Sequence, residues 1–273
     1  MEAFISAGDS IIRYSRFGKG TKTIVLLHGY GQSMDTFEDL GGQLGKSFDV
    51  VLMDLPGSGF STWGEREVIT VKYMAECVSE VLTKLGVERY FLVGHSMGGY
   101  VAAELIAADS ARIEGVQFLH SLPFGDSEER RALRRREIEL LLADKKEMLA
   151  VANPLKGFAS INAGRCSEAI EEKVEQFLQT EDAALIATLR GLMERCDLSS
   201  AVSSYSENNP VEFIFGEFDE YIPLEMRERV IELIPSATIQ TLPKSGHMGY
   251  KEEPGSVYTI VSAFLGLDVS HES

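Results

Sequence analysis

The sequence is poor in basic residues and in long apolar runs, and each shortage excludes a class of protein. Its 273 residues include 26 Lys and Arg against 42 Asp and Glu, a formal net charge of -16 at pH 7. A protein with this excess of negative charge repels phosphate backbones and anionic lipids, so neither nucleic acid nor a membrane is an expected partner. No run approaches the roughly 20 apolar residues of a membrane span, and residues 1–10 carry no signal-like segment. We therefore expect a cytoplasmic location.

Cysteine is also scarce. Cys77, Cys166 and Cys196 are an odd set without C-x-x-C spacing, and we interpret them as structural or incidental thiols rather than reactive ones. The remaining composition, 44% hydrophobic and 25% charged, is ordinary for a globular protein. The length suits one α/β body, alone or with an insertion. No feature of the sequence indicates an oligomeric state.

Short apolar runs that end in small or polar residues predict a parallel sheet. Runs of about five residues, apolar on both faces, are typical of buried parallel strands. Three such runs lie at 23–27, 50–53 and 90–93, and further runs at 116–119, 211–215 and 238–242 extend the sheet. A helical pattern over 71–85, stopped by Gly86, makes a β-α-β unit, and 5–17 predicts a hairpin that turns at Gly8-Asp9. The fold class is therefore α/β, a mostly parallel sheet with helices on both faces.

The stretch 122–209 interrupts this pattern and predicts a helical insertion between core segments 1–121 and 210–273. It lacks strand-like runs and has helical periodicity over 128–150, 167–179 and 182–196. One part is rich in arginine, with Arg130, Arg131, Arg134, Arg135 and Arg136 among glutamates. We interpret that run as a solvated, salt-bridged helix face rather than an anion site.

The motif that carries the chemistry is Gly94-His95-Ser96-Met97-Gly98. It follows a predicted strand and precedes a helical pattern, the context in which G-x-S-x-G forms a nucleophile elbow. A serine on so tight a turn needs very small residues two positions away on each side, and Gly94 and Gly98 supply them. G-x-G-x-x-G and the lysine of a phosphate loop are both missing. Ser96 is the predicted nucleophile.

A serine nucleophile needs a base, and the base needs an anion that fixes its tautomer. Asp219 follows the strand run 211–215, and His247 follows the run 238–242, so the chain order is Ser, Asp, His. All three lie past the carboxyl ends of parallel strands, where α/β sheets gather their sites. Asp219 could instead cap the helix that follows Pro223, and Glu217 and Glu220 are rival acids.

Acyl transfer also needs backbone amides that stabilise the tetrahedral oxyanion. The N–H groups of Tyr30, in the His28-Gly29-Tyr30 turn, and of Met97 are the natural pair. The glycine-rich run from Asp54 to Ser61 resembles a phosphate loop, but Pro56 removes a donor and no lysine follows. We interpret it as a structural turn.

These motifs together resemble the α/β-hydrolase superfamily, and the resemblance covers nearly the whole chain. The matching segments are Leu27-His28-Gly29-Tyr30, Asp54-Leu55-Pro56-Gly57-Ser58-Gly59, Gly94-His95-Ser96-Met97-Gly98-Gly99, Gly216-Glu217-Phe218-Asp219 and Gly246-His247-Met248. The resemblance implies an eight-stranded sheet, a cap formed by 122–209, and the site assignments above. It is strongest with carboxylesterases, enol-lactonases, carbon-carbon bond hydrolases and acyl-homoserine lactonases. Epoxide hydrolases and haloalkane dehalogenases carry Asp in place of Ser96, which disfavours both.

The expected function is cleavage of a small carboxylic ester or lactone through an acyl-enzyme, with no metal and no organic cofactor. Candidate pocket walls are Tyr30, Met97, His120, Phe124 and Met248. Two alternatives remain open: carbon-carbon bond hydrolysis by the same triad, and a non-catalytic receptor for a small ligand. The substrate itself cannot be predicted, because the cap sequence matches no specificity pattern.

Overall fold

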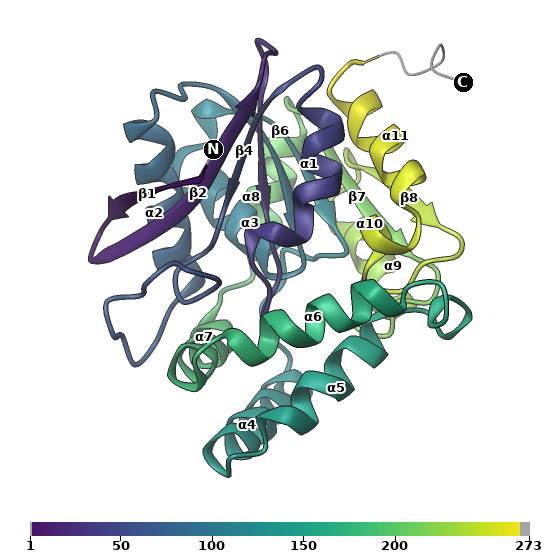
Figure 1. Ribbon diagram of the computed structural model, residues 1–273. Coiled ribbons are helices and arrows are strands. Elements are labelled where there is room, and N and C mark those ends of the chain that lie inside the picture. The colour runs from purple at the N-terminus through teal and green to yellow at the C-terminus, as the bar shows by residue number, and fades with distance from the viewer. Residues whose placement is uncertain (1, 268–273) are drawn as a thin grey trace.

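The computed structural model describes residues 2–267 and contains one eight-stranded sheet with helices on both faces (Figure 1). The strands are β1 (Glu2–Ala7), β2 (Ser10–Gly18), β3 (Thr23–Leu27), β4 (Asp49–Met53), β5 (Tyr90–His95), β6 (Ile113–Leu119), β7 (Val211–Gly216) and β8 (Thr238–Leu242). Their order is β1-β2-β4-β3-β5-β6-β7-β8. The β1–β2 hairpin joins the edge of β4 antiparallel, and the other pairs are parallel. The expected fold class and N-terminal hairpin are confirmed.

The sheet separates two apolar cores, because alternate side chains of a strand point to opposite faces. In β3, Val25 and Leu27 join the core that α2, α3, α8 and α9 cover, and Ile24 and Leu26 join the core beneath α1 and α11. These helices are α1 (Glu38–Leu44), α2 (Val71–Lys84), α3 (Met97–Asp109), α8 (Ser199–Ser206), α9 (Leu224–Leu233) and α11 (Pro254–Phe264). The short helix α10 (Gly249–Glu252) comes directly before α11. Among residues 2–267, no helix is both long and apolar enough to cross a membrane.

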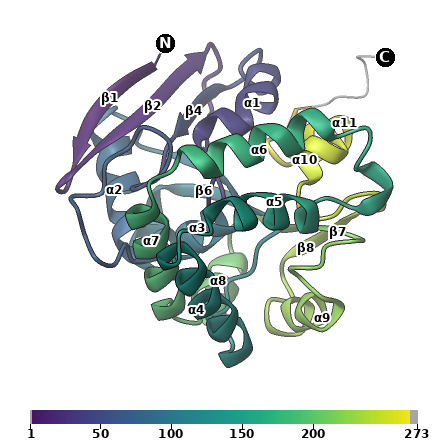
Figure 2. The ribbon, with the colours of Figure 1, turned by 60° about the horizontal axis from the view of Figure 1, so that its bottom comes forward.

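Four further helices lie together beyond the carboxyl ends of the parallel strands (Figures 1 and 2). They are α4 (Glu128–Leu142), α5 (Lys146–Gly157), α6 (Ser167–Gln179) and α7 (Asp182–Glu194). α5 lies beside α6, and α4 beside α7. A separate small core that includes Leu149, Phe177 and Leu189 holds them together. The last helix of the segment 122–209, α8, packs instead against α3 and α9 on the sheet.

The single helix predicted over 128–150 is wrong, because the chain turns sharply at Asp144. Asp144 has a left-handed φ of 58°, and the amide of Lys145 donates to Leu140 O at 3.0 Å. This left-handed residue and hydrogen bond end α4 as a C-terminal glycine usually does. Aspartate tolerates the left-handed region better than most residues do. Without a Gly or Pro to mark it, the break does not disturb the helical periodicity of the sequence.

Candidate active site

Ser96 lies on the sharp turn between β5 and α3. Its φ of 50° and ψ of -112° are strained for a residue with a side chain. A Cβ on Gly94 would lie 2.5 Å from Gly98 O, and one on Gly98 would lie 2.1 Å from Leu27 O. Both positions therefore exclude any larger residue, for the steric reason that the motif predicts. The turn places Ser96 in the wall of a large cavity.

His247 and Asp219 meet in the loops that follow β8 and β7. The Nδ1 of His247 lies 2.8 Å from Asp219 Oδ2. The other carboxylate oxygen, Oδ1, accepts the N–H groups of Tyr221 at 2.9 Å and Ile222 at 3.2 Å. One carboxylate thus orders its own loop and orients the imidazole, whereas Glu217 and Glu220 are exposed. With its proton held on Nδ1, His247 keeps Nε2 as an acceptor.

The charges of this pair are set by burial and by proximity. Burial alone would raise the pKa of Asp219, but the His247 and His120 imidazoles beside it hold that pKa well below the usual range. Burial is the main cause that lowers the pKa of His247 below 6.5, and Asp219 partly opposes this shift. Near neutral pH the geometry therefore holds an ionised Asp219 against a neutral His247.

His95 links the His247 loop to the turn after β3. Its Nε2 lies 2.9 Å from the carbonyl oxygen of His247, and its Nδ1 lies 3.1 Å from Gln32 Oε1. The same Gln32 oxygen accepts the N–H of Gly29 at 3.0 Å. Burial holds the pKa of His95 well below its usual value, so the ring is neutral. A neutral imidazole carries one N–H, so His95 can donate to the His247 carbonyl oxygen or to Gln32 Oε1, but not to both at once.

Two residues beside Ser96 in the cavity wall have backbone N–H groups without a hydrogen-bond partner among the described residues. Met97 is the first residue of α3, and the first N–H groups of a helix have no partner inside it. Within residues 2–267, the amide of Tyr30 makes no hydrogen bond to another residue. Both residues line the cavity with Ser96. This arrangement can offer two N–H donors to an oxygen bound there.

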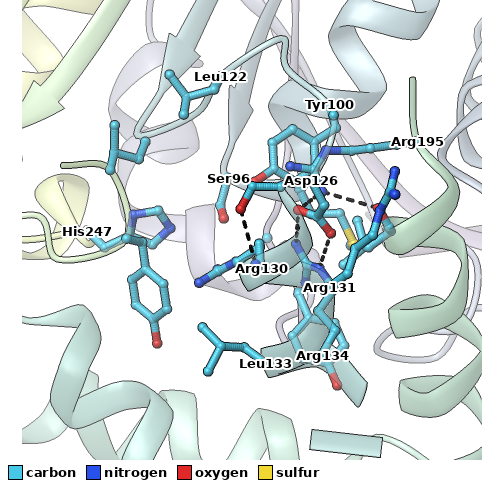
Figure 3. Close-up of a pocket in the computed structure, with 18 of the residues that line it drawn as sticks. Ser96, Tyr100, Leu122, Asp126, Arg130, Arg131, Leu133, Arg134, Arg195 and His247 are labelled. Atoms are coloured by element: carbon cyan, nitrogen blue, oxygen red, sulfur yellow. Dashed lines mark hydrogen bonds and ion pairs between the residues drawn. The ribbon is translucent and has the colours of Figure 1, made fainter. Parts of the chain in front are cut away.

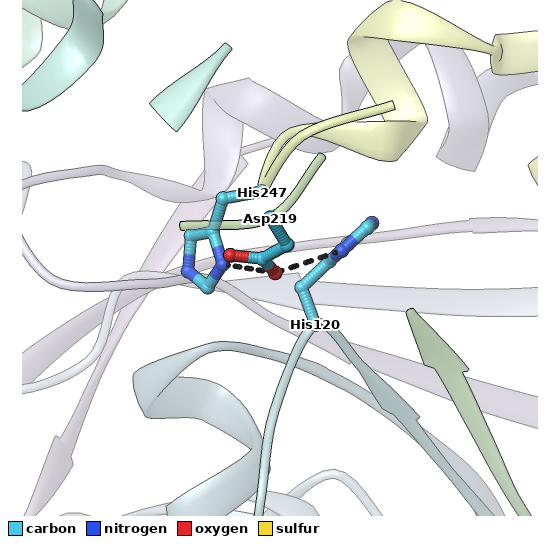
Figure 4. A group of neighbouring side chains, drawn as sticks. All are labelled: His120, Asp219 and His247. Carbon is cyan, nitrogen blue, oxygen red and sulfur yellow. Dashed lines mark hydrogen bonds and ion pairs between the residues drawn. The ribbon is translucent and has the colours of Figure 1, made fainter. Parts of the chain in front are cut away.

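His120 lies behind Asp219 and not in the cavity wall (Figure 4). Its Nδ1, the Nδ1 of His247 and a carboxylate oxygen of Asp219 lie within 4.8 Å of one another, as metal ligands could. However, His120 Nε2 accepts the N–H of Gly249 at 3.1 Å, so the ring proton is on Nδ1, which lies 3.3 Å from Asp219 Oδ2. A metal ion would need an unprotonated Nδ1 on His120 as its ligand. This set of donors therefore does not fit a metal ion.

A cavity of about 870 Å³ lies between the sheet and the cap helices (Figure 3). Its cap side contains Asp126, which lies between Arg134 Nε at 2.5 Å and Arg195 Nη1 at 2.6 Å. The interpretation of the arginine run as a solvated face is thus correct only in part. Arg135 and Arg136 pair with exposed glutamates, but Arg134 is buried and Arg130 lines the cavity.

Three of the predicted wall residues lie elsewhere. The described residues that line the cavity include Tyr30 and Met97 but not His120, Phe124 or Met248. Phe124 is buried in the core under α3, with the Arg229 guanidinium 4.2 Å from its ring centre. Met248 is buried next to His247.

Among the wall residues that sequence reasoning missed are Gln32 and Lys173. Neither belongs to a motif. A polar residue two positions after the His28-Gly29-Tyr30 turn was the one available signal for Gln32.

The loop from Asp54 to Ser61 has a structural role, as interpreted. The buried Asp54 carboxylate accepts the N–H groups of Met34 at 2.7 Å and Phe60 at 2.9 Å. His28 accepts the N–H of Leu55 at 3.0 Å through Nε2. Because these donors serve the protein's own side chains, they are not available to a phosphate.

Comparison with known proteins gives the same fold. Residues 22–254 match the family described as alpha/beta hydrolase fold. The chain is 28% identical to the dihydrolipoyllysine-residue acetyltransferase component of the acetoin cleaving system of Cupriavidus necator, over 93% of this chain but 66% of that protein. It is 26% identical to the pimeloyl-[acyl-carrier protein] methyl ester esterase of Aeromonas hydrophila, over 93% of this chain and 99% of that one. A thermophilic esterase from Thermogutta terrifontis superposes with a TM-score of 0.90 at 24% identity, covering 97% and 98% of the two chains.

Proposed function

Because the chain belongs to the α/β-hydrolase fold family, we propose that it is a serine hydrolase of small carboxylic esters or lactones. Ser96 is the nucleophile, His247 the general base and Asp219 the group that orients the base. The observation that carries this proposal is the 2.8 Å contact between His247 Nδ1 and Asp219 Oδ2, behind a strained Ser96 in the same cavity wall as His247. A relative of nearly equal length is named for ester cleavage, which supports the same class.

The reaction proceeds in two steps that use one base. Ser96 Oγ attacks the carbonyl carbon while its proton passes to His247 Nε2, and the imidazolium formed is stabilised by Asp219. The tetrahedral intermediate then collapses, the leaving alkoxide takes the proton from His247, and an acyl-enzyme remains. Water, deprotonated by His247, attacks the acyl carbon and releases the acid and free Ser96.

The oxyanion of each tetrahedral intermediate accepts hydrogen bonds from the Tyr30 and Met97 amides. These donors are fixed by the turn after β3 and by the start of α3, so they need little reorganisation during the reaction. His95 supports this arrangement, because its buried ring lies between the His247 carbonyl oxygen and Gln32, whose Oε1 accepts the N–H of Gly29.

The division of the chain into a core and an inserted cap segment agrees with the roles proposed for its residues. Core segments 1–121 and 210–273 supply the nucleophile, base, acid and oxyanion donors, and the inserted segment 122–209 supplies the cap side of the cavity. A volume of about 870 Å³ lies within the range of roughly 300–1,000 Å³ typical of small-molecule sites. This supports a small-molecule ester or lactone as the substrate.

The first experiment measures hydrolysis of p-nitrophenyl esters from acetate to long acyl chains. We expect turnover by the native protein and a loss of at least about a thousandfold in kcat for Ser96→Ala. The matched control is Ser127→Ala, a serine in the same cavity wall that caps α4. It should keep its rate within a few fold and lose about 1 kcal/mol of stability.

Equal rates for the native protein and a folded Ser96→Ala variant would overturn the proposal. If neither protein exceeds the background rate, carbon-carbon bond hydrolase substrates are tested next, because the same triad serves them. Tight binding of a ligand without turnover would instead identify a receptor.

A further inference from the structure

Lys173 is a half-buried residue of α6 that lines the cavity with Ser96 and His247. Within residues 2–267 its Nζ makes one polar contact, with Met248 Sδ at 3.6 Å, and no carboxylate lies within salt-bridge distance. A thioether sulfur is a weak acceptor and carries no charge. Among the residues that the structure describes, Lys173 thus lines the cavity without a counter-ion.

This lack of a partner is not caused by a shortage of acids. The chain carries 42 acidic against 26 basic residues, and Lys173 lies in a helix rich in glutamate. The neighbouring Glu172 is used elsewhere: its Oε2 accepts Lys251 Nζ at 2.8 Å and its Oε1 accepts Gln176 Nε2 at 3.1 Å. Burial lowers the pKa of Lys173 to about 8, so its ammonium form still predominates at pH 7.

An unpaired ammonium at this place opposes the reaction unless something neutralises it. Besides burial, the charge of Lys173 contributes to the lowered pKa values of His95 and His247. The imidazolium that His247 becomes during acylation is repelled in the same way. A bound anion beside Lys173 would remove this repulsion in the transition state, and it would also add a charge-assisted hydrogen bond to substrate binding.

We propose that Lys173 binds an anionic group of the substrate, so that the ester or lactone cleaved at Ser96 carries a carboxylate. The inference rests on the proposed function for the reaction and on the cavity geometry for the binding. Lys173 would then favour monoanionic esters over neutral ones. A bound neutral ester leaves the Lys173 ammonium without a counter-ion, whereas the carboxylate of a monoanionic ester pairs with it.

The test compares the methyl monoesters of succinate, glutarate and adipate with methyl butyrate, valerate and hexanoate, which have acyl groups of the same carbon number. Methanol release gives kcat/KM for each, and the quantity of interest is the ratio of anionic to neutral ester. We expect Lys173→Met to lower this ratio about tenfold or more, as the loss of a charged hydrogen bond does.

Arg130→Met is the matched control. Arg130 lines the same cavity and, within residues 2–267, pairs with no carboxylate, its guanidinium lying 5.2 Å from the Tyr221 ring centre. We expect this variant to keep the ratio within about twofold of the native one, because its guanidinium already lies over the Tyr221 ring as a cation–π partner. An equal fall in both variants would overturn the inference in favour of a general positive potential. An unchanged ratio in Lys173→Met would overturn it outright.

A binding measurement separates this inference from the proposed function. Calorimetric titration of glutarate into the native protein and Lys173→Met needs no turnover. Weaker binding to the variant by about tenfold supports the anion site even if no ester is cleaved. Equal binding, or no binding to either protein, overturns the anion site even if neutral esters are hydrolysed and Ser96→Ala is inactive.

Discussion

His120 lies against Asp219 on the side away from His247, with its Nδ1 3.3 Å from Asp219 Oδ2 (Figure 4). The same oxygen lies 2.8 Å from His247 Nδ1. The His120 ring is oriented by the N–H of Gly249, and its backbone has a left-handed φ of 47°. His120 is thus a buried positioning residue, which acts on His247 through the carboxylate that both imidazoles contact.

The pair His120→Leu and His120→Asn tests this role. Leucine removes the polar contact between His120 Nδ1 and Asp219, so we expect kcat/KM to fall about five- to tenfold. Asn tolerates a left-handed φ and can place an N–H near the position of the lost Nδ1, so it should restore most of the rate. The measurement is kcat/KM on a short p-nitrophenyl ester.

The pH profile distinguishes positioning from a merely structural role. Without the His120 donor, Asp219 is more basic and stabilises the His247 imidazolium more strongly, so the acid limb of kcat/KM should move to higher pH in His120→Leu. Equal rates in His120→Leu and His120→Asn, with both acid limbs at the native position, would contradict the assignment.

The native enzyme should remain active at mildly acidic pH. His247 acts as a base only when neutral, and burial lowers its pKa below 6.5. Of the titratable groups around it, Asp219 raises that pKa while His120 and Lys173 lower it. Activity is therefore lost only as the pH falls through a value below 6.5, which the acid limb of kcat/KM measures. A midpoint above about 7 would show that Asp219 outweighs burial.

Much of the fold and of the site could be predicted from the sequence, because both depend on local patterns. A strand such as β3 is a continuous apolar or β-branched run, and the sharp turn at Ser96 requires glycines at fixed spacing. Chain order then places Asp219 and His247 past neighbouring strand ends, since the carboxyl ends of parallel strands meet at one edge of the sheet.

The residues that could not be predicted depend on tertiary contacts. Lys173 lies among glutamates, a pattern typical of a solvent-facing helix, and only the packing of α6 over the cavity sets it apart. The arginine run had the same ambiguity, because Arg134 becomes buried only where Asp126 and Arg195 meet it. His120 lies one residue past β6, and the loops after β7 and β8 determine what it contacts.

Stability of the cap should depend on Asp126. Its side chain is fully buried between Arg134 and Arg195, whose charges lower its pKa against the effect of burial. Asp126→Asn leaves two buried guanidinium groups without an anion and should cost about 3–5 kcal/mol. Glu139→Gln, which breaks an exposed pair with Arg136, should cost under about 1 kcal/mol. Chemical denaturation measures both.

The cost of Asp126→Asn should shrink on acidification. The folded pKa of Asp126 lies below its unfolded value, so the stabilisation is present above the unfolded pKa and is lost as the pH falls through the folded one. Equal losses for Asp126→Asn and Glu139→Gln at pH 7 would show that the buried pair is not a net stabiliser of the cap.

The turn around Ser96 should tolerate no added methyl group, and two glycines in helices test this. A Cβ on Gly98 would lie 2.1 Å from Leu27 O, which is backbone and cannot rotate away. Gly98→Ala must therefore displace α3 from β3, at a cost of about 1–3 kcal/mol or more, and shift the Met97 amide with it. Gly42, exposed in α1, has no atom within 4 Å of its ideal Cβ, and Gly42→Ala should stabilise by about 0.5–1 kcal/mol. Thermal unfolding and ester hydrolysis are measured on both variants. A Gly98→Ala protein as stable and active as Gly42→Ala would mean that the strained turn does not fix the position of the oxyanion donor.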